Sequence, residues 1–370
     1  MLFRPSIRRC RYVLVVLLGL AAGTLRGTDA AWPLPAPTLR HLQTLTDNTG
    51  LHEFAHGTVP WHENGYCAED VARALVAVTL YEQATVQTNG RALAHIYLRY
   101  LQHSLRADGT IWNRPDHMVA NGDSYGRILW GLGTAASFQS DPECRALAET
   151  LLERLLPGWK SNLGVWPMPR AYAIQGLADY LRRHANEAAR SALIECANAN
   201  LALFAAHQHK DWSWFAEQVT YDPGRLPLSL LAAFEITHDP RYRTAGLASL
   251  DFLLTHCYDP AGQQLSPVGN QGWFKRGSAP AAFDQQPIDA ASLVEACTSA
   301  ARISGNKMYA ARARTALAWF LGNNRAHLPL YDPQSGGCHD GLSATGVSEN
   351  EGGESTVMYV IARCVVEETK

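Results

Sequence analysis

Carboxylates gather at six points of this chain, where a loop rich in Trp, Tyr, His and Gly runs into an apolar segment of small residues. Cleavage of a glycosidic bond needs two carboxyl groups, one protonated to donate to the leaving oxygen and one ionised to activate water or to attack. The pattern therefore suggests glycoside chemistry. The carboxylates at these points are Glu69, Asp70, Asp123, Glu217, Asp222, Asp284, Asp289, Glu349, Glu351 and Glu354.

Asp123 and Asp284 are the first candidates for the catalytic pair, and Glu217 and Glu354 come next. Residues 121–127 surround Asp123 with two glycines, a tyrosine and an arginine, and residues 283–289 are denser in polar groups than a helix start requires. Residues 349–354 hold three glutamates. Like charges so close raise each other's pKa and favour one protonated acid. A solvated acidic loop would have the same composition.

Helix capping is the competing interpretation of each carboxylate. Asp is a preferred N-cap, and its charge suits the helix dipole. Asp-Pro occurs five times, and Asp141 and Asp239 precede segments expected to be outer helices, where no catalytic group is expected. The same pairing favours a capping role for Asp222, which we nevertheless keep as a substrate-binding candidate.

Tryptophans supply a second signal, because a flat indole beside hydrogen-bonding groups suits the C–H face of a sugar ring. Of the ten tryptophans, six lie in these loops. The alternative is that a loop tryptophan anchors its loop in the core. The residues expected to bind substrate are Trp112, Trp212, Trp214, Trp273, Asp70, Tyr125, Arg127, Asp222, Gln285, Gln286 and Glu351.

The sequence shows no pattern typical of a metal site or a cofactor. It has no HExxH, no paired-cysteine motif and no acidic calcium loop. It also lacks a G-x-S-x-G elbow and a glycine-rich phosphate loop. We therefore expect neither metal nor cofactor, and the neighbouring histidines are better explained as hydrogen-bonding residues of a pocket.

The six loops recur every 45–65 residues or so, a spacing typical of stacked supersecondary units. Segments that are apolar on nearly all sides predict buried inner helices, and one-sided segments predict an outer layer. Six helical hairpins of this kind predict one all-α toroid, the (α/α)6 barrel, with all six loops on one rim. The inner helices are expected at 68–84, 123–139, 167–182, 223–237, 287–304 and 352–367, and the outer ones at 90–106, 142–156, 187–207, 240–256 and 306–322. A further short helix is expected at 38–46.

Residues 1–30 resemble an export signal, with a basic start, an apolar run at 13–22 and small residues near Ala30. We therefore expect a signal peptide at 1–30, a toroid domain at 31–370 and an exported protein; an uncleaved membrane anchor or a misassigned start, with a cytoplasmic protein, are the alternatives. The net charge is −2, and the first 30 residues hold five arginines against one aspartate, so the remainder is acidic. Such a chain is not expected to bind nucleic acid, or a membrane beyond the signal.

Seven cysteines follow this segment, an odd number without metal-ligand spacing. Most lie in apolar helical segments, which favours buried free thiols over a disulfide framework, although one pair could form.

Seven stretches carry a resemblance to known proteins: residues 47–51, 65–75, 212–214, 220–222, 269–273, 283–287 and 349–355. Together they resemble the six-hairpin glycosidase superfamily, and more closely uncharacterised bacterial proteins that are often named as glycosyltransferases. The resemblance spans nearly the whole chain after residue 30 and implies a toroid that acts on carbohydrate. No part of the sequence suggests a doubly wound nucleotide-sugar fold.

The sequence thus predicts a glycoside hydrolase that acts on an oligo- or polysaccharide through a carboxylate pair. One rival is a polysaccharide lyase or sugar epimerase on the same fold, which would depend on His56, His117, His339, Tyr125 or Arg276. The other is a non-catalytic glycan-binding protein whose carboxylates are all occupied in caps or in pairs with arginine.

Overall fold

The structure is a computed structural model that describes residues 34–116, 118–259 and 263–366. The expected export signal and His117 lie outside these residues. The chain divides before Leu34, and the part from Leu34 onward forms one compact unit.

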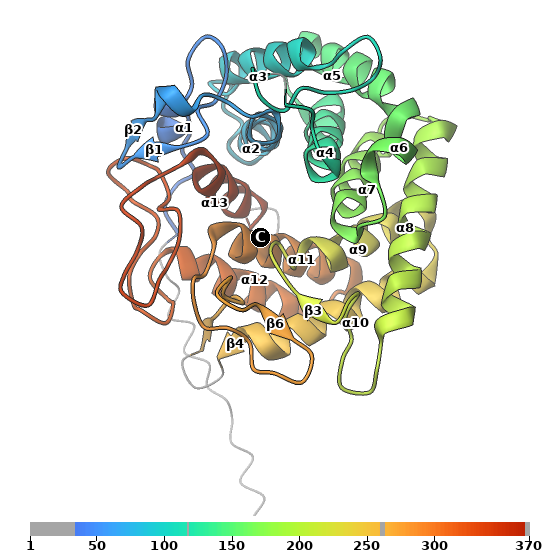
Figure 1. Cartoon of the computed structure of the whole chain (residues 1–370), viewed down its shortest axis with the longest axis vertical. Coiled ribbons are helices and arrows are strands. Elements are labelled where there is room, and N and C mark those ends of the chain that lie inside the picture. Colours follow the sequence, from blue (N-terminus) through green and yellow to red (C-terminus); the bar gives the residue numbers. More distant parts are fainter. Residues whose placement is uncertain (1–33, 117, 260–262, 367–370) are drawn as a thin grey trace, which may run out of the picture. The chain divides into compact units, whose positions relative to one another are not determined.

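Six helices form a closed inner ring in this unit (Figure 1). Each packs against the next along the chain, and the last packs against the first, which closes the ring. Their apolar faces are therefore covered on all sides, as their composition predicts. The inner helices are α2 (Ala68–Thr85), α4 (Gly122–Phe138), α7 (Pro167–Leu181), α9 (Arg225–Thr237), α11 (Pro287–Ser304) and α13 (Gly353–Val365).

A second layer of helices packs outside the ring, each against the inner helix that precedes it in the chain. These are α3 (Arg91–Ser104), α5 (Pro142–Leu155), α8 (Glu187–His207), α10 (Pro240–Cys257) and α12 (Lys307–Phe320). The short α1 (Arg40–Leu45) packs against α13, so the start of the unit supplies the outer partner of its last helix. The predicted inner and outer helices are confirmed, with ends within two residues of those observed.

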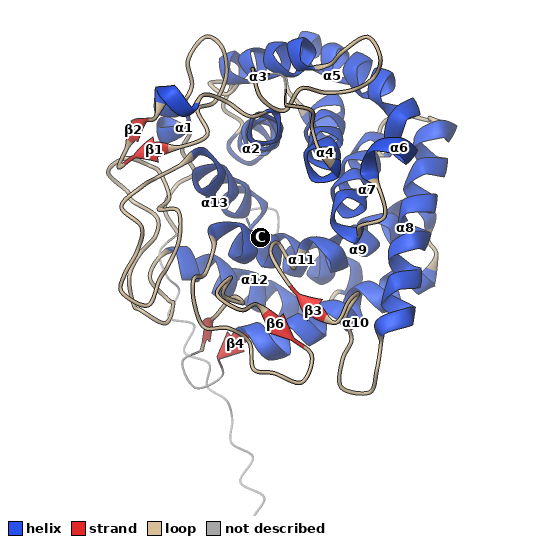
Figure 2. Cartoon of the chain, in the orientation of Figure 1, coloured by secondary structure: helices blue, strands red, loops and turns tan. Residues whose placement is uncertain are grey.

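The remaining elements are short and lie in the connections (Figure 2). Three antiparallel pairs of two-residue strands are β1 (Ala55–His56) with β2 (Val59–Pro60), β3 (Gln218–Val219) with β6 (Phe274–Lys275), and β4 (Tyr258–Asp259) with β5 (Gln264–Leu265). The pair β3–β6 joins the loop before α9 to the loop before α11. Helix α6 (Trp159–Leu163) and the 3-10 turns η1 (His62–Asn64) and η2 (Leu156–Gly158) complete the fold.

Small residues in the inner helices allow their backbones to touch. A Cβ atom at Gly133 of α4 would lie 2.0 Å from the carbonyl oxygen of Gly176 on α7. A Cβ at Gly131 would lie 2.5 Å from the carbonyl oxygen of Ala72 on α2. Only glycine fits such contacts, and this explains why the inner segments combine apolar residues with glycine.

The seven described cysteines are buried and free, which confirms their interpretation as small apolar residues. Within the described residues, no helix has the length and apolarity needed to cross a membrane.

Candidate functional site

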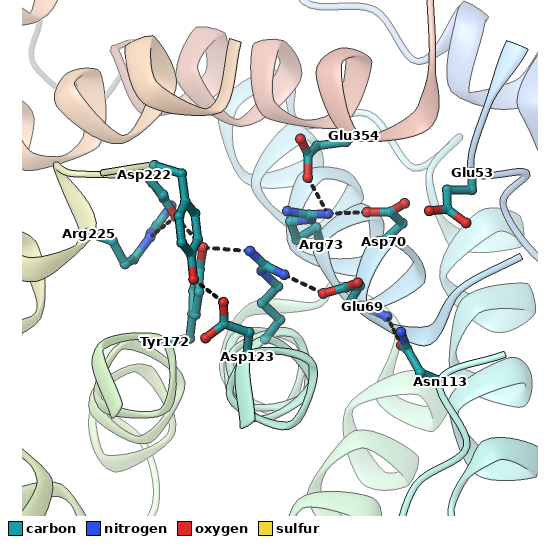
Figure 3. A network of polar contacts seen from close by, with 12 residues as sticks. Glu53, Glu69, Asp70, Arg73, Asn113, Asp123, Tyr172, Asp222, Arg225 and Glu354 are labelled. Carbon is teal, nitrogen blue, oxygen red and sulfur yellow. Dashed lines mark hydrogen bonds and ion pairs between the residues drawn. The ribbon is translucent and has the colours of Figure 1, made fainter. Parts of the chain in front are cut away.

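Charged and phenolic side chains from the first two turns of the inner helices, and from the loops just before them, form three adjoining groups of polar contacts (Figure 3). Arg73 pairs with Asp70 and Glu354, and Tyr221 with Asp123. The third group runs from Glu69 through Arg127, Tyr172 and Asp222 to Arg225. We call the three groups together the rim network. It comprises Glu69, Asp70, Arg73, Asp123, Arg127, Tyr172, Tyr221, Asp222, Arg225 and Glu354. The sequence analysis singled out six of these: Asp123 and Glu354 as catalytic, and Asp70, Arg127 and Asp222 as substrate-binding, with Glu69 among the clustered carboxylates.

Arg127 joins two sides of the network. Its guanidinium group pairs with Glu69 of α2 and donates to the hydroxyl of Tyr172 on α7 at 3.1 Å. The same group lies 4.7 Å from the centroid of the Tyr172 ring. Burial opposes ionisation of Glu69, but Arg127 and Arg73 outweigh it and hold the pKa of this carboxyl below its usual value.

Arg73 of α2 is the second branch point. It pairs with Asp70 one turn earlier and, at 2.7 Å, with Glu354 of α13. The Glu354 side chain is 42% exposed, whereas those of Arg73 and Asp70 are almost fully buried. Glu354 is therefore the member of this group that a ligand could reach.

Arg225 of α9 anchors the buried end of the network. It donates two hydrogen bonds to Glu295 of α11, at 3.1 and 2.7 Å, and one to Asp222 at 3.4 Å. Its guanidinium carbon lies 4.2 Å from the ring centroid of Trp130. Arg225 and Asp222 are fully buried, so both act by supporting the groups around them.

Asp222 is not the helix cap that its Asp-Pro sequence favours. The N-cap of α9 is Gly224, and Asp222 instead has a left-handed φ of 46°. Its carboxylate accepts from the phenol of Tyr172, and its N–H donates to the carboxyl of Asp289 at 2.6 Å. Asp141 and Asp239 do cap their outer helices, as predicted.

Asp123 has a different environment from the other carboxylates. Asn121 caps α4, which leaves Asp123 free of that role, and its carboxylate accepts a hydrogen bond from Tyr221. Burial raises the pKa of Asp123, and the charges of Glu69 and Asp222 add to this, while Arg127 and the Tyr221 hydrogen bond oppose it.

Glu53, which the sequence analysis missed, lies beside Asp70 (Figure 3). Burial first and then the charge of Asp70 raise the pKa of Glu53 to about 7, although Arg114 pairs with it. The available signal was its position in the loop before α2, in which residues 47–51 already carry the family resemblance.

Carboxyl groups outnumber arginines among the described residues in and around the rim network. Eight carboxyl groups share only four arginines, namely Arg73, Arg114, Arg127 and Arg225. The pKa is raised, in each case mainly by burial, for four of the eight. Those four are Glu53, Asp123, Asp289 and Glu295; the others are Glu69, Asp70, Asp222 and Glu354. Carboxyl groups with raised pKa values thus lie beside carboxyl groups that pair with arginines, an arrangement suited to acid–base chemistry.

Asp284 and Glu217 are not brought into this network by the contacts of the structure. Asp284 accepts from the side chain of Gln271 at 3.0 Å, and its carbonyl accepts from the N–H of Asn270 at 2.9 Å. Glu217 is 62% exposed and lies 3.5 Å from Arg276. Both belong to the loops joined by β3 and β6, so their proposed catalytic role lacks the support that Asp123 and Glu354 have.

Two of the predicted sugar-stacking residues are buried. Trp212 and Trp214 are each 2% exposed, donate their indole N–H groups to the carbonyls of Ala216 and Gln218, and pack around Phe252. This corrects their assignment, because neither ring has a free face. They anchor the long loop before α9 in the core.

Trp112 and Trp273 remain partly accessible. The guanidinium group of Arg106 lies 4.1 Å from the Trp112 ring centroid, and the indole borders a pocket of about 480 Å³ together with Arg114 and Tyr100. Trp273 packs partly against the core.

The other predicted binding residues have structural partners. Tyr125 is buried and donates to the carbonyl of Leu155, and Gln285 is fully buried and accepts from the indole of Trp319 at 2.8 Å. Glu351 is 2% exposed and accepts from Ser335 at 2.6 Å. Gln286 is the N-cap residue of α11. For Tyr125, Gln285 and Glu351, burial corrects the expectation of direct substrate contact.

Glu53, Cys67 and Asp70 offer possible metal ligands within 4.8 Å of one another. Their chemistry does not favour a metal. Burial raises the pKa of the Cys67 thiol well above its usual value, and both carboxylates already pair with arginines. We assign no metal to this group.

No family model and no curated protein matches the chain. Solved structures do match the chain. A D-mannose isomerase is 12% identical with a TM-score of 0.67, over 89% of this chain and 95% of the isomerase. A cellobiose 2-epimerase from Bacillus thermoamylovorans is 10% identical with a TM-score of 0.67, over 90% and 95%. A family 76 glycoside hydrolase from Bacteroides thetaiotaomicron is 12% identical with a TM-score of 0.65, over 87% and 73%.

The fold is the (α/α)6 toroid. The predicted fold class is thereby confirmed. Identities this low establish the fold and leave the reaction to be argued from the site.

Proposed function

We propose that this protein is a carbohydrate-active enzyme that hydrolyses glycosidic bonds, with Asp123 as the proton donor and Glu354 as the second carboxylate. The observation that carries the proposal is the unequal environment of these two carboxyl groups, which belong to different contact groups of the rim network. Burial and neighbouring carboxylates favour the protonated form of Asp123. Glu354 is exposed and forms an ion pair with Arg73.

These groups would share the two roles of glycoside cleavage. Asp123 would transfer its proton to the glycosidic oxygen as the bond from that oxygen to the anomeric carbon breaks. Glu354 would take a proton from the water that attacks the anomeric carbon, or attack that carbon itself to form a glycosyl-enzyme that water then hydrolyses. Glu53 is a further acid of the site, since its pKa of about 7 keeps much of it protonated at neutral pH.

The toroid comparisons support a carbohydrate substrate, because the three solved structures above are named as enzymes of sugars or glycosides. Export, as residues 1–30 suggest, would bring the protein to polymeric glycans outside the cytoplasm. The kinship with proteins named as glycosyltransferases stays a prediction from the sequence.

Sugar epimerisation is the second candidate. Arg127, Tyr172 and Tyr221 place cationic and phenolic groups beside Asp123, and such groups suit proton abstraction next to a carbonyl. Of the residues on which this rival depended, Tyr125 is buried against Leu155 and Arg276 pairs with Glu217 in the loops joined by β3 and β6. Burial also raises the pKa of both tyrosines in the network, which makes them poor bases.

The second rival, a non-catalytic glycan-binding protein, predicts that the carboxylates are occupied in caps or in pairs with arginine. Glu69, Asp70 and Glu354 do pair with arginines. Asp123 differs from these three carboxylates, because among the contacts of the structure it neither caps α4 nor forms a direct pair with an arginine.

Release of reducing ends from a panel of bacterial and plant glycans tests the proposal. We expect Asp123→Asn and Glu354→Gln each to lower the rate by about 10²–10⁴-fold with the melting temperature unchanged. Glu217→Gln is the matched control, since it makes the same chemical change at an exposed residue outside the network. Equal loss in all three variants, or in none, would refute the assigned roles.

A further inference from the structure

A cavity lies inside the barrel, toward the end at which most of the inner helices terminate. It has a volume of about 210 Å³ and is lined by side chains from all six inner helices, most of them from the middle or the second half of the helix. The rim network lies in the first two turns of the inner helices and in the loops before them, so the two regions extend toward opposite ends of the ring. They meet at Arg225, which pairs with Glu295 and stacks on Trp130. Its lining includes Trp130, Gln175, Leu228, Glu235, Thr298 and Ser299.

The charged groups of this cavity are already paired. Glu235 accepts hydrogen bonds from Arg182 at 2.8 Å and from Arg302 at 3.1 Å. Glu295 is held by the two hydrogen bonds from Arg225. A charged ligand would have to compete with one of these pairs, whereas a neutral ligand would leave them intact.

Three neutral polar groups of the same wall lack partners. Among the described residues, the hydroxyls of Thr298 and Ser299 and the side-chain carbonyl of Gln175 make no hydrogen bond. Thr298 and Ser299 are only 6% and 5% exposed. A buried polar atom without a partner is costly, so such groups usually meet water or a ligand.

The rest of the wall is apolar, with Leu228 and the indole of Trp130 among its members. A mixture of apolar surface, an aromatic ring and a few hydrogen-bonding groups is typical of sites for small organic molecules. It also matches a sugar or polyol, which presents C–H faces and hydroxyls together.

We propose that this end of the barrel is a second binding site, for a small neutral polyhydroxylated molecule the size of a monosaccharide. Its hydroxyls would pair with Thr298, Ser299 and Gln175, and its C–H groups would contact the apolar wall. The site does not depend on the reaction at the rim network and stands whether or not that network hydrolyses glycosides.

Isothermal titration calorimetry with D-glucose, D-mannose and glycerol tests the site. We expect millimolar binding of at least one of them to the full-length protein. Thr298→Val keeps the shape of the side chain and removes its hydroxyl, and should weaken that binding about five- to tenfold, as expected for one lost hydrogen bond. Asp123→Asn, at the opposite end, should leave it unchanged.

Loss of binding in Asp123→Asn with none in Thr298→Val would overturn the proposal, because the sugar would then occupy the rim network. Absence of heat with all three probes would overturn it as well. Crystals soaked in the best binder give an independent readout: ligand density between Trp130 and Thr298 supports the site, and ordered water alone at that position refutes it.

Discussion

The phenol of Tyr221 donates a hydrogen bond to the carboxylate of Asp123. Tyr221 lies in the loop before α9 and Asp123 on α4, and α7 stands between these two helices in the ring. The loop before α9 therefore reaches across a neighbouring hairpin to touch the start of α4. This contact links the position of one rim loop to the protonation of the carboxyl that we propose as the acid.

Tyr221→Phe should change the pH dependence of activity. The hydrogen bond from Tyr221 lowers the pKa of Asp123, so its removal should raise that pKa further. Because the acid works in its protonated form, the alkaline limb of kcat/KM should move to higher pH. A pH–rate profile of wild type and variant measures this; an unchanged limb, or one moved to lower pH, would remove Asp123 from the acid role.

Tyr172→Phe should affect stability more than Tyr221→Phe. Tyr172 is fully buried and donates to Asp222, which would be left as a buried carboxylate with fewer partners. We expect a loss of about 1–3 kcal/mol in the free energy of unfolding. Urea denaturation of both variants compares them. Equal losses of unfolding free energy in the two variants would contradict a larger stabilising effect of the Tyr172–Asp222 hydrogen bond.

Arg225→Met should be the most destabilising change in the network. It would leave Glu295 and Asp222 buried without their cation, at a cost of about 3–5 kcal/mol. Arg241→Met is the matched control, because the Arg241–Asp239 pair is exposed to solvent and its loss should cost far less unfolding free energy. Similar unfolding free energies for the two variants would contradict the importance of the buried pair.

Glu53 should make stability depend on pH between about 4.5 and 7. Its pKa is raised on folding, so the folded protein binds more protons than the unfolded chain in this window and loses stability as pH rises through 7. In Glu53→Gln this decline should shrink. Relative to wild type, the variant should gain about 1 kcal/mol between pH 5 and pH 8, a figure reduced for solvent screening of the partly exposed group.

Thermal unfolding across that pH range provides the measurement. Glu63→Gln serves as the control, since Glu63 is exposed and accepts a hydrogen bond from the nearby Trp61 indole. A parallel pH dependence in wild type and Glu53→Gln would show that Glu53 titrates normally.

The helices were predictable from the sequence, and the partners within the site were not. Helix limits depend on local periodicity and on signals such as the Asp-Pro cap at Asp141, so they can be derived from neighbouring residues. Arg225 and Glu295 lie 70 positions apart and meet only because α9 and α11 pack side by side in the closed ring. No local pattern specifies such a pair.

The same reasoning explains the errors at Trp212 and Trp214. A long loop rich in aromatic residues is compatible with either a ligand shelf or an anchor. The structure favours the anchor, because Phe252 on α10 and Phe274 on β6 cover the Trp212 ring, and both come from distant parts of the chain. The catalytic role of Asp123 stays a prediction; the sequence singles out this residue because its surroundings exceed what a helix cap requires, and Asn121 indeed caps α4 in its place.

Proton NMR of glycans incubated with the protein in D2O tests the central claim most directly. Hydrolysis predicts new reducing-end anomeric signals that are absent with Asp123→Asn, while the other ring protons persist. Loss of a ring proton beside the anomeric carbon, without any new reducing end, would contradict hydrolysis and establish epimerisation. Unchanged spectra for every glycan, together with binding that Asp123→Asn does not alter, would contradict catalysis at the rim network.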